Sequence, residues 1–360
     1  MPPNGPAGAA PHDAGTVDVV ALGESMVTFL PSRPGRLADV PSFERGIGGA
    51  ESNVACALAS AGHTARWVGR VGADGFGDHL VEAIAAYGVD TSAVRRDPTR
   101  PTGIYFRTAG DRATDAHEVA YYRAGSAASA MAVDTVDLAA VRACRVLHLS
   151  GITAALSGDC LGLMRELTAR RPGRPLVSFD VNHRLGLWRD ADGPRVLLDL
   201  ARGADIVFVG DDEAREAWGL RGARAIRDAL PEPDVLVVKY GKAGAVVFDK
   251  DTEGIEDASG TATFVRALRV DVVAAVGAGD AFAAGFLSAT LRGLPARDRL
   301  RHGHLMAAAA LTVPGDLAAP PARDHADRLA ALDDGGWETL RLGPGWTEAD
   351  TRAEEEVRTP

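Results

Sequence analysis

The chain of 360 residues is 46% apolar and 24% charged, so it can bury a large core in one or two domains. Its formal net charge of −10 argues against a nucleic-acid partner, because duplex binding needs clustered Lys and Arg. The opening lacks the basic and apolar stretches of a signal peptide or membrane anchor, so we expect a disordered leader over residues 1–16 and a cytoplasmic protein.

Runs rich in Val, Ile and Leu predict strands, and the amphipathic stretches between many of them predict helices. Continuous apolar runs separated by helices indicate a mostly parallel sheet covered on both faces, a doubly wound α/β fold over residues 17–335. The predicted strands are 17–23, 65–72, 145–151, 175–181, 205–210 and 234–241, and the predicted helices are 51–62, 76–88, 159–171, 195–203 and 279–293.

Two segments, about 26–46 and 103–123, interrupt this succession of strands and helices. In the second, apolar and polar residues alternate, as in GIYFRTAG and HEVAYYRAG. We expect them to form a small separate sheet that serves as a lid, with an exposed edge compatible with a homo-oligomer. The charged stretch 343–360 predicts a solvated tail. Three cysteines without metal-ligand spacing are expected to be buried free thiols: Cys56, Cys144 and Cys160.

The segment VGAGDAF, residues 276–282, lies between a strand-like run and a helix of small residues. Gly277, Ala278 and Gly279 would let backbone N–H groups converge on an anion at the helix start. Asp280 would there accept a proton from a substrate hydroxyl during phosphoryl transfer. The alternative interpretation is a tight turn in which Asp280 is an ordinary N-cap.

A second glycine-rich segment, GIGGAESNVA at 46–55, is followed by VGRVGADGFG at 68–77. Together with VGAGDAFAAGF these segments resemble the two signatures of the PfkB, or ribokinase-like, carbohydrate kinases, and the resemblance covers about residues 17–330. It implies an α/β core with a β-sheet lid, ATP as phosphoryl donor, Mg²⁺, and Asp280 as catalytic base. A Rossmann dehydrogenase is disfavoured, because the first segment lacks the third glycine of G-x-G-x-x-G.

Candidate substrate residues lie in the second lid segment and after the strand at 175–181. Tyr121 and Arg123 alternate onto one face, and Tyr105 would join them across the sheet. Arg184 is expected to share a face with Asp180 and Asn182 at a strand end. Two arginines with tyrosines suit an anionic polyhydroxy acid. The alternative is a solvated arginine and tyrosines that pack at the core edge.

The segments HLSGITAALS, FDVNHRLGLW and YYRAGSAASA resemble those of 2-keto-3-deoxygluconate kinases. This resemblance implies phosphorylation of 2-keto-3-deoxygluconate to 2-keto-3-deoxy-6-phosphogluconate. Fructokinases and 5-dehydro-2-deoxygluconokinases are the nearest alternatives, and a catalytically silent sugar-acid binding protein is an alternative of another class. The implied substrate contacts, with Asn53 from the first glycine-rich segment, are Gly49, Asn53, Tyr105, Tyr121, Arg123 and Arg184.

The prediction of a nucleotide site depends on the turn KYGKAGA at 239–245, which the resemblance identifies as nucleotide-binding. A plain hairpin would also explain this turn. Glu213 matches the family's Asn-x-x-Glu and would help to bind Mg²⁺, although Gly210 replaces the Asn. Ala274 replaces an Asp that helps to hold a monovalent cation, so dependence on K⁺ stays open. The implied nucleotide contacts are Lys239, Gly241, Gly244, Gly277, Gly279 and His304.

Overall fold

The computed structural model describes residues 15–33, 35–108, 118–188, 192–250 and 261–348. Its centre is one eight-stranded sheet in the order β14-β13-β12-β11-β10-β9-β1-β4. The strands from β12 to β4 pair in parallel, whereas β13 pairs antiparallel with both β12 and β14. The predicted mostly parallel sheet is therefore confirmed. Its strands are β1 (Val17–Leu22), β4 (Ala65–Val68), β9 (Cys144–Ser150), β10 (Leu176–Asp180), β11 (Ile206–Gly210), β12 (Val235–Lys239), β13 (Ala245–Asp249) and β14 (Thr261–Val265).

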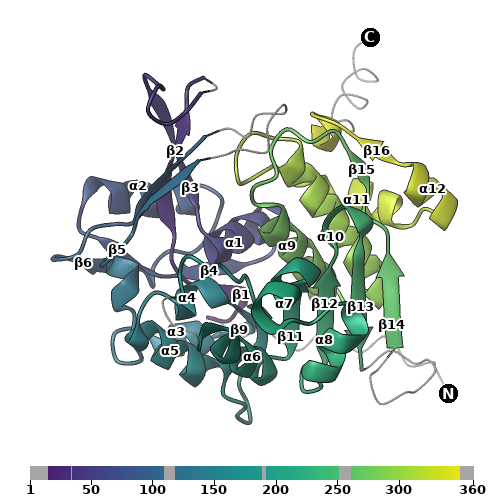
Figure 1. Cartoon of the computed structure of the whole chain (residues 1–360), viewed down its shortest axis with the longest axis horizontal. Coiled ribbons are helices and arrows are strands. Elements are labelled where there is room, and N and C mark those ends of the chain that lie inside the picture. The colour runs from purple at the N-terminus through teal and green to yellow at the C-terminus, as the bar shows by residue number, and fades with distance from the viewer. Residues whose placement is uncertain (1–14, 34, 109–117, 189–191, 251–260, 349–360) are drawn as a thin grey trace, which may run out of the picture.

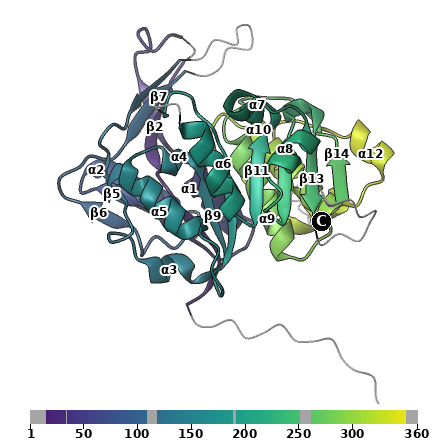
Figure 2. The same cartoon turned by 60° about the horizontal axis from the view of Figure 1, so that its bottom comes forward.

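Helices cover both faces of this sheet, as Figures 1 and 2 show. One face packs against α1, α9, α10, α11 and α12, and the other against α3 and α5 to α8. The helices are α1 (Ala50–Ser60), α2 (Gly75–Ala85), α3 (Leu138–Arg142), α4 (Gly151–Ala154), α5 (Gly158–Thr168), α6 (Gly193–Gly203), α7 (Asp211–Trp218), α8 (Ala223–Ala229), α9 (Ala278–Leu291), α10 (Ala296–Leu311), α11 (Arg323–Ala330) and α12 (Asp334–Thr339).

Helix α10 was not among the predicted helices, although it has 16 residues and packs directly on α9. Its first half, ARDRLRHGH, is polar, so the sequence shows no apolar stripe there. The structure buries Arg301, whose guanidinium carbon lies 4.6 Å from the centroid of the Trp337 ring. Close packing of the two helices also needs Gly285, because a Cβ there would collide with the backbone carbonyl of His302. Contacts with neighbouring helices thus stabilise α10 although its own sequence lacks the apolar pattern of a helix.

The predicted separate sheet is present, and it stands apart from the helical layers in Figure 1. It has the order β3-β2-β7-β8. The first of the two predicted lid segments supplies β2 and most of β3, and the second supplies β7 and β8. Stacked aromatic rings hold one face together, with 4.7 Å between the ring centroids of Phe29 and Phe106. Residues 109–117 of the second segment lie outside the described residues. The strands are β2 (Met26–Pro31), β3 (Phe43–Gly48), β7 (Ile104–Arg107) and β8 (Val119–Tyr122), and two further pairs are β5 (Arg70–Gly72) with β6 (Arg95–Asp97) and β15 (Arg269–Val270) with β16 (Arg341–Leu342).

The packed part of the chain extends beyond residue 343, where the sequence predicted that the solvated tail begins. The side chain of Trp346 is buried in the core beside α10 and α11. The packed chain therefore continues to at least this residue, because a large aromatic ring gains by burial even inside a polar stretch. Residues 1–14 of the expected leader and 349–360 of the expected tail lie outside the described residues. The three cysteines are buried and free, as expected. In the described ranges, no helix has the length and apolar character to cross a membrane.

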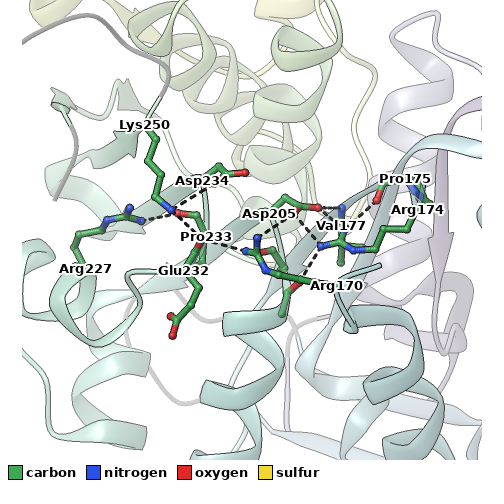
Figure 3. A network of polar contacts seen from close by, with 12 residues as sticks. Arg170, Arg174, Pro175, Val177, Asp205, Arg227, Glu232, Pro233, Asp234 and Lys250 are labelled. Carbon is green, nitrogen blue, oxygen red and sulfur yellow. Dashed lines mark hydrogen bonds and ion pairs between the residues drawn. The ribbon is translucent and has the colours of Figure 1, made fainter. Parts of the chain in front are cut away.

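The amino-terminal edge of the central sheet is held by a network of buried charge, drawn in Figure 3. Arg174 donates to both carboxylate oxygens of Asp205, at 2.5 and 2.9 Å. The backbone N–H of Val177 donates to the same carboxylate, and the N–H of Val235 donates to the backbone carbonyl of Asp205. Asp205 thereby joins the beginnings of β10, β11 and β12.

Candidate active site

A glycine turn begins α9 on the sheet face that α1 also covers. Gly277 is the N-cap residue and has φ 75°, in the left-handed region that favours glycine. A Cβ there would also collide with the backbone carbonyl of Asp316. Ala278, Gly279 and Asp280 form the first turn of this 14-residue helix, whose N–H groups have no intrahelical acceptors. The turn has the geometry that binds a phosphoryl group at a helix start.

Asp280 is partly buried, and it faces α1. Asn53 Nδ2, on α1, donates a 2.8 Å hydrogen bond to Asp280 Oδ2. Burial raises the pKa of Asp280 to about 7, the Asn53 hydrogen bond and the Lys239 ammonium oppose this, and the charges of Asp180 and Asp316 add to it. A carboxylate with a pKa near neutral pH is suited to accept a proton at that pH. Position and pKa together allow the predicted role as a base.

Charged side chains meet beside Asp280 at the carboxyl ends of neighbouring parallel strands. Asp180 ends β10 and Lys239 ends β12, and Lys239 Nζ donates to Asp180 Oδ2 at 2.8 Å. Glu213, in the first turn of α7, accepts the N–H of Gly210 at 2.8 Å. Its side chain thus caps α7 at the point where the family pattern has Asn, while its second oxygen lies 3.8 Å from Arg184 Nη1.

Across from the glycine turn, strand β7 brings Tyr105 to the site. The buried Tyr105 hydroxyl donates to Asp316 Oδ2 at 3.1 Å, and Arg107 Nη2 donates to Asp316 Oδ1 at 2.6 Å. Because the carbonyl of Asp316 also packs on Gly277, this one residue contacts both the small sheet and the glycine turn. Burial raises the pKa of the Tyr105 phenol, so it stays protonated and donates.

Tyr121 and Arg123 lie beside Tyr105, as the alternation predicted. Tyr105 and Tyr121 are register partners, with ring centroids 5.4 Å apart, and the Arg123 guanidinium carbon lies 5.8 Å from the Tyr121 ring centroid. Arg123 forms an ion pair with the buried Glu24, which also accepts the Ser126 hydroxyl at 2.7 Å. Arg123 Nε is buried and has no hydrogen-bond partner among the described residues. One donor of Arg123 is therefore unused within the described part of the chain.

The predicted shared face of Asp180, Asn182 and Arg184 is wrong. Strand β10 ends at Asp180, and Asn182 has φ 41°, so the alternation of a strand does not continue. The Arg184 side chain is 58% exposed and turns toward Glu213. Its Nη1 lies 3.8 Å from Glu213 Oε1.

The remaining predicted residues are three glycines, described by their backbones, and one buried histidine. Gly49 begins α1, where a Cβ would collide with the carbonyl of Glu24. Gly241 and Gly244 flank a short turn between the antiparallel strands β12 and β13, so this turn is a hairpin, and Gly244 has φ 132°. His304 is buried against Phe282, and its Nε2 lies 3.3 Å from the carbonyl of Val265. The His304 side chain is thus buried, and its role as a nucleotide contact stays a prediction.

Three residues of the site were not predicted from the sequence: Glu24, Arg107 and Asp316. Glu24 lies two residues after the end of the buried strand β1, a position that could have indicated a site residue at the carboxyl edge. Asp316 stands in the irregular segment PGDLAAP, 36 positions beyond Asp280, where nothing local distinguishes it. Its place becomes visible only through its contacts with β7.

Comparisons with known proteins identify the family of the chain. The model of the pfkB family carbohydrate kinases matches residues 17–323. The 2-dehydro-3-deoxygluconokinase of Bacillus subtilis is 34% identical, covering 86% of this chain and 94% of its own. The enzyme of the same name from Thermoproteus tenax is also 34% identical, covering 89% and 96%. A crystal structure of a sugar kinase from Pyrococcus horikoshii in complex with ATP superposes with a TM-score of 0.73 at 25% identity, covering 85% and 96%.

Proposed function

The chain belongs to the pfkB family of carbohydrate kinases, and we propose that it transfers the γ-phosphoryl group of ATP to the primary hydroxyl of 2-keto-3-deoxygluconate. The product would be 2-keto-3-deoxy-6-phosphogluconate. This substrate, also called 2-dehydro-3-deoxygluconate, is the one in the names of the two curated relatives. The observation that carries the proposal is Asp280, held by Asn53 in the first turn of α9 behind the glycine turn.

In the reaction, the substrate hydroxyl oxygen forms a bond to the γ-phosphorus while the bond from that phosphorus to the bridging oxygen of ADP breaks. Asp280 takes the hydroxyl proton, and its pKa of about 7 leaves a substantial ionised fraction at neutral pH. The backbone N–H groups of residues 277–280 would donate to the phosphoryl oxygens. Asn53 orients the carboxylate, so the base and the anion-binding turn approach the same atoms.

Two carboxylates fit a Mg²⁺ ion at the nucleotide side. The described residues include no group of three or more His, Cys, Asp or Glu side chains that could hold a metal. Mg²⁺ usually keeps several waters and takes one or two carboxylates together with substrate phosphates. Glu213, with Asp180 near it, supplies that number. When bound, the ion would neutralise charge on the phosphates of ATP.

The sugar side fits an acid. Arg123 keeps a buried, unpartnered Nε, and a guanidinium binds carboxylates more strongly than it binds neutral hydroxyls. The buried oxygen Oδ1 of Asn53 likewise has no hydrogen-bond partner in the described part of the chain, so it would accept a sugar hydroxyl. The exposed ring of Tyr121 lies over the guanidinium. A donor, Arg123 Nε, and an acceptor, Asn53 Oδ1, therefore remain for a ligand that has a carboxylate at one end and hydroxyls along its length.

The test is the release of ADP from Mg²⁺-ATP with four sugars in parallel: 2-keto-3-deoxygluconate, fructose, ribose and 5-dehydro-2-deoxygluconate. The highest kcat/KM is expected with 2-keto-3-deoxygluconate. A preference for a neutral sugar would overturn the assignment of Arg123 and leave a carbohydrate kinase of other specificity. No turnover of any of them, with binding of the acid by calorimetry, would favour a silent binding protein.

A further inference from the structure

Lys239 occupies a central position among the charges of the site. Its nitrogen lies 2.8 Å from Asp180 Oδ2, and Glu213 and Asp280 are close enough to stabilise its charge. The Asp180 carboxylate is buried and accepts this hydrogen bond directly, so the ammonium group is held at the carboxyl ends of β10 and β12. The Lys239 side chain is 19% exposed, so it is not fully covered by the protein.

The ammonium group also borders the glycine turn. Lys239 Nζ lies 3.9 Å from the point where a Cβ on Gly279 would stand. Apart from the chain neighbours of Gly279 and the nearby backbone of α9, no other heavy atom of the described chain lies within 4 Å of that point. The open side of the turn, where the phosphoryl group would bind, is therefore bordered by a fixed positive charge. Asp180, which is buried, holds that charge in place.

The segment before the turn offers no carboxylate for a monovalent cation. Ala274 stands at the position of the family's Asp, and its backbone, like that of Val273, donates to the carbonyl of Leu311. Asp271 is the nearest acidic residue before the turn in the sequence, and it is paired with Arg341 at 2.6 Å. Positive charge beside the turn thus comes from the chain itself.

We propose that the Lys239 ammonium is the built-in cation of the phosphate site: it neutralises the phosphoryl group during transfer, so that turnover needs no monovalent metal ion. The inference rests on the proposed function, since it concerns the same transfer. The bonds made and broken are those given above, and Lys239 keeps its protons throughout. Removal of one such charge at an oxyanion costs about 10²- to 10³-fold in kcat.

The first test uses the wild-type enzyme. ADP is measured directly by chromatography, because a coupling enzyme could itself need K⁺, and K⁺ is replaced by tetramethylammonium at equal ionic strength. Rates within about twofold are expected, whereas stimulation of tenfold or more by K⁺ would overturn the inference. Any sugar that the wild-type enzyme phosphorylates serves, so a wrong substrate assignment leaves this test intact. Absence of turnover with every sugar would overturn the proposed function and the inference together.

The second test is chemical rescue of Lys239→Ala. We expect kcat to fall about 10²- to 10³-fold with a smaller change in KM for the sugar, and n-propylammonium to restore at least tenfold of the loss. Tetramethylammonium at the same concentration should restore nothing. Lys250→Met, which removes an exposed lysine at the opposite edge of the sheet (Figure 3), is the matched control and should keep wild-type rates. A change confined to KM, or a folded variant that amines do not rescue, would contradict the inference.

Discussion

The two edges of the central sheet differ in whether their buried polar groups have partners. At the amino-terminal edge, the carboxylate of Asp205 is fully engaged by Arg174 and by the backbone N–H of Val177 (Figure 3). At the carboxyl-terminal edge, burial and neighbouring carboxylates raise the pKa of Asp280, and Asn53 Oδ1 has no hydrogen-bond partner among the described residues. The same sheet thus has one edge built for stability and one that keeps unmet polar groups for a ligand.

This difference shows how the fold separates its tasks. A buried polar group without a partner costs free energy, and proteins keep such groups where a ligand will meet them. The sheet strands connect the edges directly, since β10 and β11 run from the Asp205 network to Asp180 and to Gly210 beside Glu213. Changes at the two edges should therefore have different consequences for activity and for stability.

The largest effect is expected from Asp280→Asn. Loss of the base should lower kcat by about 10²- to 10⁴-fold. The free energy of unfolding at pH 8 should stay the same or rise, because the site disfavours the ionised carboxylate. Rate assays and thermal unfolding of the same preparations check both. Turnover within tenfold of wild type would remove Asp280 from the mechanism.

The converse change is Asp205→Asn. It leaves Arg174 largely buried without its counter-ion, and breaking such a pair costs about 3–5 kcal/mol of unfolding free energy. The kcat of the folded fraction should stay within about twofold of wild type, since the residue lies at the opposite edge. Urea unfolding and rate assays at low temperature measure the two quantities. A stable variant with low kcat would contradict the separation of the edges.

Arg123→Ala should raise KM for a sugar acid about ten- to a hundredfold, which corresponds to one hydrogen bond to a charged group. Its effect on the KM for fructose should be smaller. Arg184→Ala is the matched control and should change KM less, because its side chain is 58% exposed and turned toward Glu213. Thermal unfolding is needed beside the kinetics, since removal of Arg123 leaves the buried Glu24 without its partner. Equal effects on both sugars would refute the carboxylate assignment.

The smallest effect is the pH dependence. Asp280 must be ionised to accept a proton, so kcat should rise about tenfold per pH unit below 7 and level off above it. The free energy of unfolding should change in the opposite direction. Because folding raises the pKa of Asp280, the protein should lose stability as the pH rises from about 4, the pKa in the unfolded chain, to about 7. Stability curves of wild type and Asp280→Asn over this range should therefore diverge. Parallel curves would show that Asp280 is not buried as described.

The sequence predicts the glycine turn and the start of α9 well because their signals are local. Glycines followed by Asp280 at a helix start determine both the backbone conformation and the position of the carboxylate. Contacts between distant segments were beyond such reasoning: Asp316 meets Tyr105 across 211 positions of the chain. Arg184 was misplaced because one residue, Asn182, leaves the extended conformation at the end of β10. Local patterns thus locate the chemistry, and long-range contacts decide which side chains complete it.

The most direct test of the central claim is ³¹P NMR of the product formed from 2-keto-3-deoxygluconate and Mg²⁺-ATP, with Asp280→Asn in parallel. We expect the wild-type enzyme to give ADP and one phosphate monoester on the primary carbon, and the variant to give at least 10²-fold less. No monoester from the wild-type enzyme would contradict the proposed reaction, and equal yields from both proteins would contradict Asp280 as its base.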